Sequence, residues 1–222
     1  MKIDPDGHKI AGIFLACVCI TGGVYYVTQW QVLIGLSVFL CLLIVFSFYF
    51  FRDPARVGPG GTEVVVSAAD GIVIDVARVE AEGFDENEAL RIAVIMNIFN
   101  VHVNRSPYAG KVVGIKHQNG KKLSAFNKRA EYENEYNDTD IETSFGLIRV
   151  RQIAGLIARR VVTRVKKGDV LKHGDKLGII RFGSRVDVFL PVVFEPLIVK
   201  GDHVRGGETV IARPLSRRKG KI

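Results

Sequence analysis

Charge is absent from a long stretch near the start of this 222-residue chain: Ile10 to Phe51 contains no Asp, Glu, Lys, Arg or His. That stretch is about twice the roughly 20 residues that one membrane-spanning helix needs. Its main polar interruption is Thr28-Gln29-Trp30-Gln31, and tryptophan is common at the membrane–water interface. The pattern predicts two apolar helices, about 10–28 and 32–51, joined by a tight turn.

We expect residues 1–54 to form a membrane anchor with both ends on one side of the bilayer. Lys2, Lys9, Arg52 and Arg56 flank that side, so the positive-inside bias predicts that the rest of the chain lies in the cytoplasm at the cell membrane. The apolar run is too long for a cleaved signal peptide, and no clear small-residue cleavage site follows it. A shallow hairpin that does not cross the bilayer is the alternative.

Cysteine is scarce, and several motifs are missing. Cys17, Cys19 and Cys41 all lie in the apolar segment, where they are small hydrophobic residues rather than bridges or ligands. No Cys/His zinc spacing occurs, so we expect no metal site. Glycine-rich phosphate loops and a Gly-x-Ser-x-Gly elbow are also absent. The net charge of +8 suits an anionic partner, and it cannot by itself choose between nucleic acid and an acidic membrane surface.

Strand–helix alternation is missing from residues 55–222, which disfavours a parallel doubly wound sheet. Short runs rich in Val, Ile and Leu with turn residues between them predict a mainly-β domain. Lys121–Asn137 is the least β-like part, and a loop or a short helix is expected there. The predicted strands are 63–67, 71–79, 90–96, 111–117, 147–153, 160–165 and 176–182.

An internal repeat refines this prediction. Lys167–Leu177 matches Lys200–Val210 at an offset of 33 (200 − 167), and each copy has a Gly-Asp turn, a basic residue, a second glycine turn and a strand. Two similar β-turn-β units predict a compact barrel or sandwich, as in lipoyl and biotinyl carrier domains.

The pair Gly183-Ser184 lies between two β-prone runs, 179–182 and 186–190. In the second run Val186, Val188 and Leu190 alternate with Arg185, Asp187 and Phe189, which predicts a strand with one face against a core. Glycine can adopt backbone angles that other residues cannot, so its carbonyl can be turned toward the next side chain. The pair is either a β-bulge that contains a serine or a nucleophile aimed at its own peptide bond.

Two further residues could take part in chemistry. Asp70-Gly71 is first of all a common turn pair. His102 lies in a run that also holds Asn100, Asn104 and Arg105, and either a buried structural histidine or a functional one fits that pattern.

Taken in order, these motifs resemble the phosphatidylserine decarboxylase proenzymes of the short, pyruvoyl-dependent branch. The resemblance covers nearly the whole chain, from the apolar hairpin to about Ala212. The motifs that carry it are Phe51-Arg52-Asp53-Pro54, Ala69-Asp70-Gly71, Phe99-Asn100-Val101-His102-Val103-Asn104-Arg105, Gln152–Arg160 and Phe182-Gly183-Ser184-Arg185.

The resemblance implies that Ser184 attacks the Gly183 carbonyl and that the chain divides into 1–183 and 184–222, which stay together. Ser184 would become a pyruvoyl group, the covalent cofactor that converts phosphatidylserine to phosphatidylethanolamine. Asp70 and His102 match the positions that activate the serine, and Asn104 and Arg105 are expected to contact the substrate.

One departure concerns Arg105, because longer members of the family have a His-x-x-His pair and Arg105 occupies the second place. Either His102 serves both self-cleavage and decarboxylation, or Arg105 replaces the second histidine through its charge. The substrate could carry ester-linked diacyl tails or archaeal-type ether tails, since both present the same headgroup. We expect an anionic membrane surface and no nucleic acid as partner, and a homo-oligomer remains open.

Two rival interpretations are weaker. A non-enzymatic membrane-anchored adaptor with a lipoyl-like domain explains the hairpin and the repeat but gives Gly183-Ser184 and His102 no role. A membrane serine hydrolase that uses Ser184 on an external substrate lacks a recognisable elbow or oxyanion motif.

Overall fold

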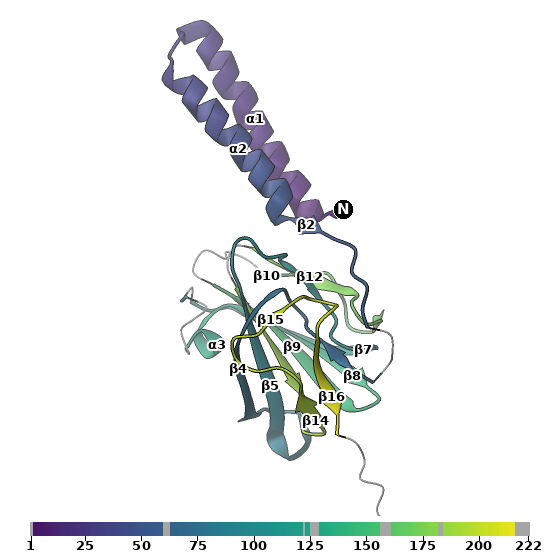
Figure 1. The fold of residues 1–222 in the computed structure, drawn as a ribbon. Helices are drawn as coiled ribbons and strands as arrows, with labels where there is room; N and C mark the ends of the chain where they lie inside the picture. The colour runs from purple at the N-terminus through teal and green to yellow at the C-terminus, as the bar shows by residue number, and fades with distance from the viewer. Residues whose placement is uncertain are drawn as a thin grey trace, which may run out of the picture. The chain divides into compact units, whose positions relative to one another are not determined.

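The computed structural model describes residues 2–59, 63–121, 123–124, 129–155, 161–181 and 184–215. The chain divides into two compact units, Met1–Ala55 and Arg56–Ile222 (Figure 1). Each unit is described separately below.

The first unit is a hairpin of two apolar helices, α1 (Pro5–Thr28) and α2 (Val32–Phe50), with the short strands β1 (Lys2–Ile3) and β2 (Arg52–Asp53) paired at its base. By length and composition, both helices could cross a membrane. Across the pair, the hydroxyl oxygens of Thr21 and Ser37 lie 2.8 Å apart. The predicted helical hairpin is confirmed.

Helix α1 begins five residues earlier than predicted. The Asp4 carboxylate accepts a hydrogen bond from the Asp6 amide at 3.0 Å, and Pro5 occupies the first helical position. A carboxylate N-cap followed by proline is a favourable way to start a helix, so the polar residues before the apolar run belong to it.

The second unit is mainly β, as predicted. In the described part of this unit, an eight-stranded sheet has the order β11-β7-β8-β9-β13-β5-β4-β15, and two three-stranded sheets have the orders β10-β12-β6 and β14-β16-β3. Neighbouring strands are antiparallel throughout. The strands are β3 (Val65–Val66), β4 (Gly71–Glu80), β5 (Glu88–Met96), β6 (Val103–Arg105), β7 (Gly110–Gln118), β8 (Tyr136–Thr143), β9 (Gly146–Ala154), β10 (Val161–Thr163), β11 (Val170–Leu171), β12 (Lys176–Ile180), β13 (Ser184–Leu190), β14 (Phe194–Pro196), β15 (His203–Val204) and β16 (Val210–Pro214).

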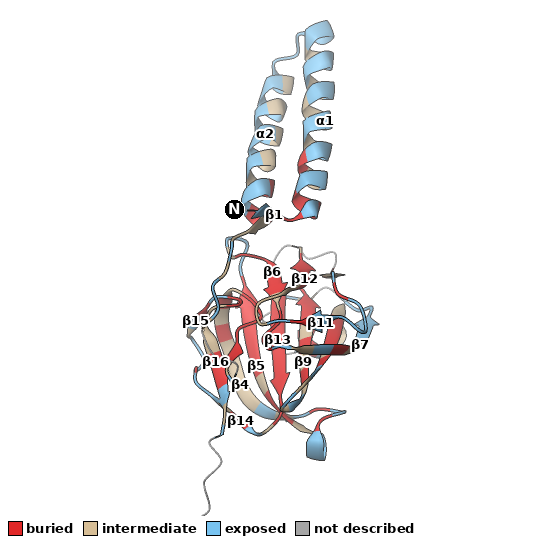
Figure 2. Ribbon diagram, turned by 90° about the vertical axis from the view of Figure 1, so that its right-hand side faces the viewer, coloured by how far each residue is buried: buried red, intermediate tan, exposed pale blue. Residues whose placement is uncertain are grey.

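Strand β13 lies in the middle of the curled large sheet, between β5 and β9, and is buried along its whole length (Figure 2). Val186, Val188 and Leu190 point into the main core, as the alternation predicts. The opposite face is buried too, which the alternation did not indicate. Its two charged residues pair with one another, and Phe189 packs in a second apolar cluster.

The stretch 121–137 contains the short helix α3 (Ala130–Glu133). Elsewhere in the unit, a 3-10 turn spans Asp85–Asn87. Strand β8, which follows α3, was not predicted. Asp138 and Asp140 suggest a turn in the sequence, but each carboxylate lies across the sheet from an arginine of β9. Arg160, the expected start of the next strand, lies outside the described residues.

The sequence repeat has a structural counterpart. Gly168 and Gly201 adopt nearly the same left-handed conformation, with φ of 100° and 101°. The carboxylates of Asp169 and Asp202 each accept a hydrogen bond at 2.8 Å from the amide three residues earlier. The two copies lead into β11 and β15, which form opposite ends of the large sheet.

The correspondence extends beyond the repeat, with a second offset of 39 (110 − 71) between Gly71 and Gly110. Reciprocal backbone hydrogen bonds join these regions: the Arg105 amide donates to Ala68 at 2.9 Å, and the Val66 amide donates to Pro107 at 3.0 Å. The β4–β5 and β7–β8 pairings also contain a bulge at equivalent points. The unit is therefore built from two similar halves that meet between β9 and β13.

Candidate active site

Ser184 is the first residue of β13, and its backbone lies between Met96 on β5 and Ala154 on β9. The residue is completely buried, and its Oγ has no hydrogen-bond partner among the described residues. A buried hydroxyl without a partner costs about 1–3 kcal/mol, so such groups are uncommon unless they have a function. Gly183, the expected cleavage-site glycine, lies outside the described residues.

Two buried amides lie close to this serine in the fold. Gln152 Nε2 donates to Asn104 Oδ1 at 2.7 Å, and Asn104 Nδ2 lies 3.7 Å from the sulfur of Met96, the strand partner of Ser184. Gln152 Oε1 is buried and, within the described residues, lacks a partner. Because Gln152 is two residues from Ala154 along β9, its side chain is on the same face of the sheet as that of Ser184.

His102 is fully buried immediately before β6. Its Nδ1 lies 3.0 Å from the carbonyl oxygen of Asn100, which suits an imidazole protonated on Nδ1 with Nε2 as the basic nitrogen. Val103 pairs with Ile179 of β12, so His102 lies beside the end of the strand that leads toward Ser184. This position fits a general base for the serine.

Asp70 lies in the turn before β4, as its Asp-Gly sequence predicts. One carboxylate oxygen accepts from Arg56 Nη2 at 2.7 Å, and the other accepts from the Gly206 amide at 2.8 Å. In the described structure these contacts, rather than one with His102, hold the carboxylate. Burial opposes the charge on Arg56, but Asp70 and Glu208 outweigh it and raise the pKa of the guanidinium.

Arg105 faces the same turn. Its Nη1 donates to the Gly174 carbonyl at 3.0 Å, and its Cδ would lie 2.9 Å from a Cβ added at Gly207. Arg105 is adjacent to Asn104 in sequence, but successive strand residues point to opposite faces. The structure therefore brings the expected residues together in two groups. Asn104 contacts Gln152 and Met96, the strand partner of Ser184, and Asp70 and Arg105 meet at the 206–207 turn. The contact described for His102, with Asn100, belongs to neither group.

Sequence reasoning did not single out Gln152 or Arg56. Gln152 is the first residue of the family motif Gln152–Arg160, and that motif could have pointed to it. Arg56 was interpreted only as a charge beside the membrane, whereas it pairs with Asp70 and Glu208, 14 and 152 residues away. Nothing local in the sequence indicates that second partner.

Comparison with known proteins identifies the family. The family model described as "Phosphatidylserine decarboxylase" matches residues 43–212. The phosphatidylserine decarboxylase proenzyme of Pelobacter propionicus is 45% identical over 183 residues, which cover 82% of this chain and 83% of the relative. That of Ruegeria pomeroyi is 43% identical over 212 residues, which cover 94% and 93%.

This chain belongs to the phosphatidylserine decarboxylase family, and it is an enzyme. The resemblance expected from the sequence is confirmed. The word proenzyme in the relatives' names implies that they are made as precursors.

Proposed function

We propose that this protein decarboxylates phosphatidylserine to phosphatidylethanolamine after it cleaves itself between Gly183 and Ser184. The observation that carries the proposal is the buried Ser184 hydroxyl, without a partner in the described structure, at the start of the central strand in a chain of this family. Cleavage there would give chains 1–183 and 184–222, the smaller with 39 residues (222 − 183).

The cleavage chemistry needs a base and an acyl shift. Ser184 Oγ loses its proton, attacks the Gly183 carbonyl carbon and takes over the acyl group as the peptide C–N bond breaks. Elimination then removes the α-proton of residue 184 and breaks its Cβ–Oγ bond, so that Gly183 leaves as a carboxylate and dehydroalanine remains. Addition of water to the dehydroalanine releases ammonia and leaves a pyruvoyl group. We assign the role of base to His102, because its Nδ1 contact leaves Nε2 as the basic nitrogen.

The buried, unpartnered Ser184 oxygen fits a residue that is converted to such a group. When present, the pyruvoyl ketone would supply an electron sink for the pair left behind as carbon dioxide departs. The backbones of Met96 and Ala154 hold position 184 from both sides, and the Asn104 and Gln152 amides offer polar contacts. Arg105 would bind an anionic part of the headgroup, since the planar guanidinium matches the geometry of a carboxylate or phosphate.

The Asp70 carboxylate would stabilise the positive charge that His102 acquires. Such a role does not require Asp70 to leave Arg56 and Gly206, because a carboxylate can accept several hydrogen bonds.

The apolar hairpin and the basic character of the chain suit a substrate in a membrane. We propose that the second unit faces the cytoplasm, where anionic lipid attracts nearby basic residues by about 1 kcal/mol each. Headgroup recognition of this kind would accept a diacyl lipid or an ether analogue.

Intact-mass measurement of the purified protein, combined with an assay on phosphatidylserine vesicles, tests the proposal. We expect two polypeptides, the smaller with a blocked, keto-containing amino end, and Ser184→Ala should remove both cleavage and activity. Ser106→Ala is the matched control, because Ser106 is also fully buried but its hydroxyl donates to the Tyr108 carbonyl at 2.7 Å. Full activity in a chain that stays uncleaved would refute the pyruvoyl mechanism.

A further inference from the structure

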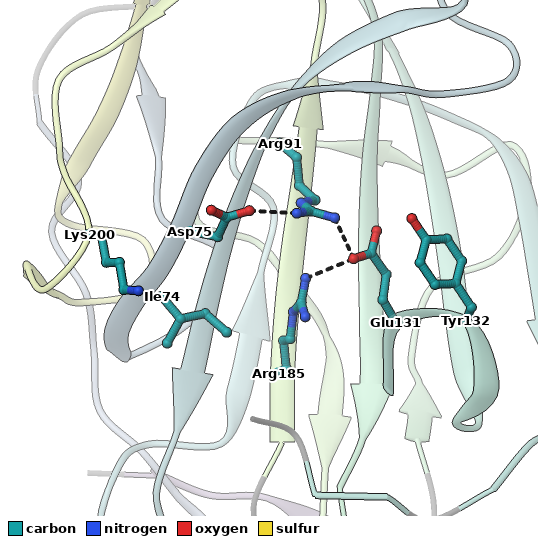
Figure 3. A pocket seen from close by; sticks show the side chains of 7 residues that line it. All are labelled: Ile74, Asp75, Arg91, Glu131, Tyr132, Arg185 and Lys200. Atoms are coloured by element: carbon teal, nitrogen blue, oxygen red, sulfur yellow. Dashed lines mark hydrogen bonds and ion pairs between the residues drawn. The ribbon is translucent and has the colours of Figure 1, made fainter. Parts of the chain in front are cut away.

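The face of β13 opposite Ser184 carries a network of ion pairs that begins at the next residue, Arg185 (Figure 3). Its guanidinium makes two 2.6 Å hydrogen bonds to the Asp187 carboxylate and a third, at 3.2 Å, to Glu131 on α3. Arg91 on β5 binds the same oxygen of Glu131 and reaches Asp75 at 2.5 Å. Arg185 and Glu131 are 4% and 5% exposed, so solvent screens their pair only weakly.

The proposed cleavage would divide this network between two polypeptides. Arg185 and Asp187 would belong to the small chain, and Glu131 and Arg91 would belong to the large chain. Within the described structure, Glu131 supplies the side-chain contact from the large chain to Arg185.

The segment that carries Glu131 also holds the strand next to Ser184. The Asn134 side chain donates to the Ala154 carbonyl at 2.7 Å, and the Ala154 amide donates to the Glu135 carbonyl at 2.9 Å. Ala154 is the residue that pairs with Ser184 on β9. Residues 131–135 therefore contact both the neighbour of Ser184 across the sheet and its neighbour along the chain.

A cavity of about 640 Å³ lies beside this network and is lined in part by Arg91, Glu131, Arg185 and Lys200 (Figure 3). Arg185 is one of the residues that line this cavity, and its guanidinium is held by hydrogen bonds to two carboxylates, Asp187 and Glu131.

We propose that Glu131 is a positioning residue that keeps the new amino end of the small chain in place after cleavage. The inference rests on the proposed self-cleavage. In the precursor, covalent bonds hold β13 at both ends. After cleavage the Ser184 end is a chain terminus, and termini fray unless contacts hold them. Backbone pairing with Met96 and Ala154 is one such contact, and side-chain contacts add to it. Arg185 is the first side chain of the new terminus that could provide such a contact.

The test compares Glu131→Gln with Glu133→Gln in the full-length protein. Glu133 lies on the same helix and pairs with the exposed Lys121 at 2.8 Å, so its substitution controls for a lost charge on α3. We would measure the rate of self-cleavage, and then kcat and KM on phosphatidylserine vesicles per pyruvoyl-bearing small chain.

For Glu131→Gln we expect cleavage within about threefold of the unmodified rate, and kcat lowered at least about tenfold with KM nearly unchanged, because a small displacement of a reacting group can cost up to about 100-fold. Glu131→Asp should restore part of kcat, because it keeps the carboxylate. Glu133→Gln should leave both steps unchanged.

Two results would overturn the inference: a kcat for Glu131→Gln equal to that of Glu133→Gln, or a parallel loss of cleavage and kcat. If Glu131→Gln does not fold, Arg185→Lys takes its place, and it must lower kcat while cleavage continues. A wild-type protein that is active but never cleaved would refute the proposed function itself, whatever Glu131 does.

Discussion

The Asp70 carboxylate can act in two ways, and substitution separates them. Asp70 holds the 206–207 turn through Arg56 and the Gly206 amide, at 2.7 and 2.8 Å, and we also propose that it stabilises charge on His102. Asp70→Asn keeps the size of the side chain but removes its charge. Because Asp70 and Arg56 are only 14% and 9% exposed, the lost charge-assisted hydrogen bond should lower the free energy of unfolding by about 1.5–3 kcal/mol.

The effect of Asp70→Asn on the rate of self-cleavage should exceed what the loss of stability alone would cause. We expect Asp70→Asn to slow self-cleavage by at least about 100-fold, since general-base catalysis contributes about 10²–10⁴-fold and the serine must lose its proton in that step. Turnover by enzyme that has already matured should fall by less than about tenfold, because Ser184 no longer carries a hydroxyl then.

Arg56→Gln is the control, because it breaks the same ion pair and leaves the carboxylate in place. Cleavage can be followed by mass spectrometry after synthesis of each variant, and activity can be normalised to the amount of small chain. Arg56→Gln should lose at least as much stability, because it also breaks the pair with Glu208, but it should slow cleavage only slightly. Equal slowing by Asp70→Asn and Arg56→Gln would show that Asp70 acts only by holding its turn.

Three further predictions follow from single contacts. Arg105→Lys should raise KM for phosphatidylserine with little effect on self-cleavage, because lysine lacks the planar set of N–H donors of the guanidinium. A collapse of cleavage with unchanged KM would instead give Arg105 the role of the missing second histidine. Gly178→Ala should lower the free energy of unfolding, measured by urea denaturation, by at least about 1–3 kcal/mol, since its Cβ would lie 2.2 Å from the Val162 carbonyl oxygen. Gly114→Ala is the control, because its Cβ meets only ordinary contacts at 3.4 Å, and equal urea midpoints for the two variants would contradict this packing argument. Burial raises the pKa of Asp187 from 3.8 to about 6, so its contribution to stability is full below pH 3.8 and is lost as pH rises through about 6. Asp187→Asn should therefore make the urea midpoint of unfolding less dependent on pH over that range, and an unchanged pH dependence would show that Asp187 is not the group responsible.

Periodicity and the absence of charge were sufficient to predict the hairpin and about half of the described strands. The start of α1 could also have been predicted, because Asp4-Pro5 is a recognisable helix start. Strand β8 is different, since Asp138 and Asp140 favour turns on their own. Only the arginines of β9 opposite them make a strand favourable there, and that register is a property of the folded sheet.

The candidate site residues that the sequence singles out lie in ordered motifs. Ser184, Asn104 and His102 are all buried, and the first two are joined through Met96. Glu131 and Arg56 could not be found in this way. Glu131 lies 54 residues from Arg185, and Arg56 lies 152 residues from Glu208, so neither pair has a local pattern.

The two similar halves of the second unit explain why the repeat predicted the fold better than the site. At the offset of 39, Asp70 corresponds to Ala109, Asn104 to Val65 and Arg105 to Val66. The backbone hydrogen bonds at these points are equivalent, but the polar side chains occur in only one copy of each pair. A duplicated backbone thus supplies two nearly equal turns and strand ends, and neither dictates chemistry by itself. The proposed site residues come from both halves, so such a site would arise from differences between halves that the sequence repeat does not reveal.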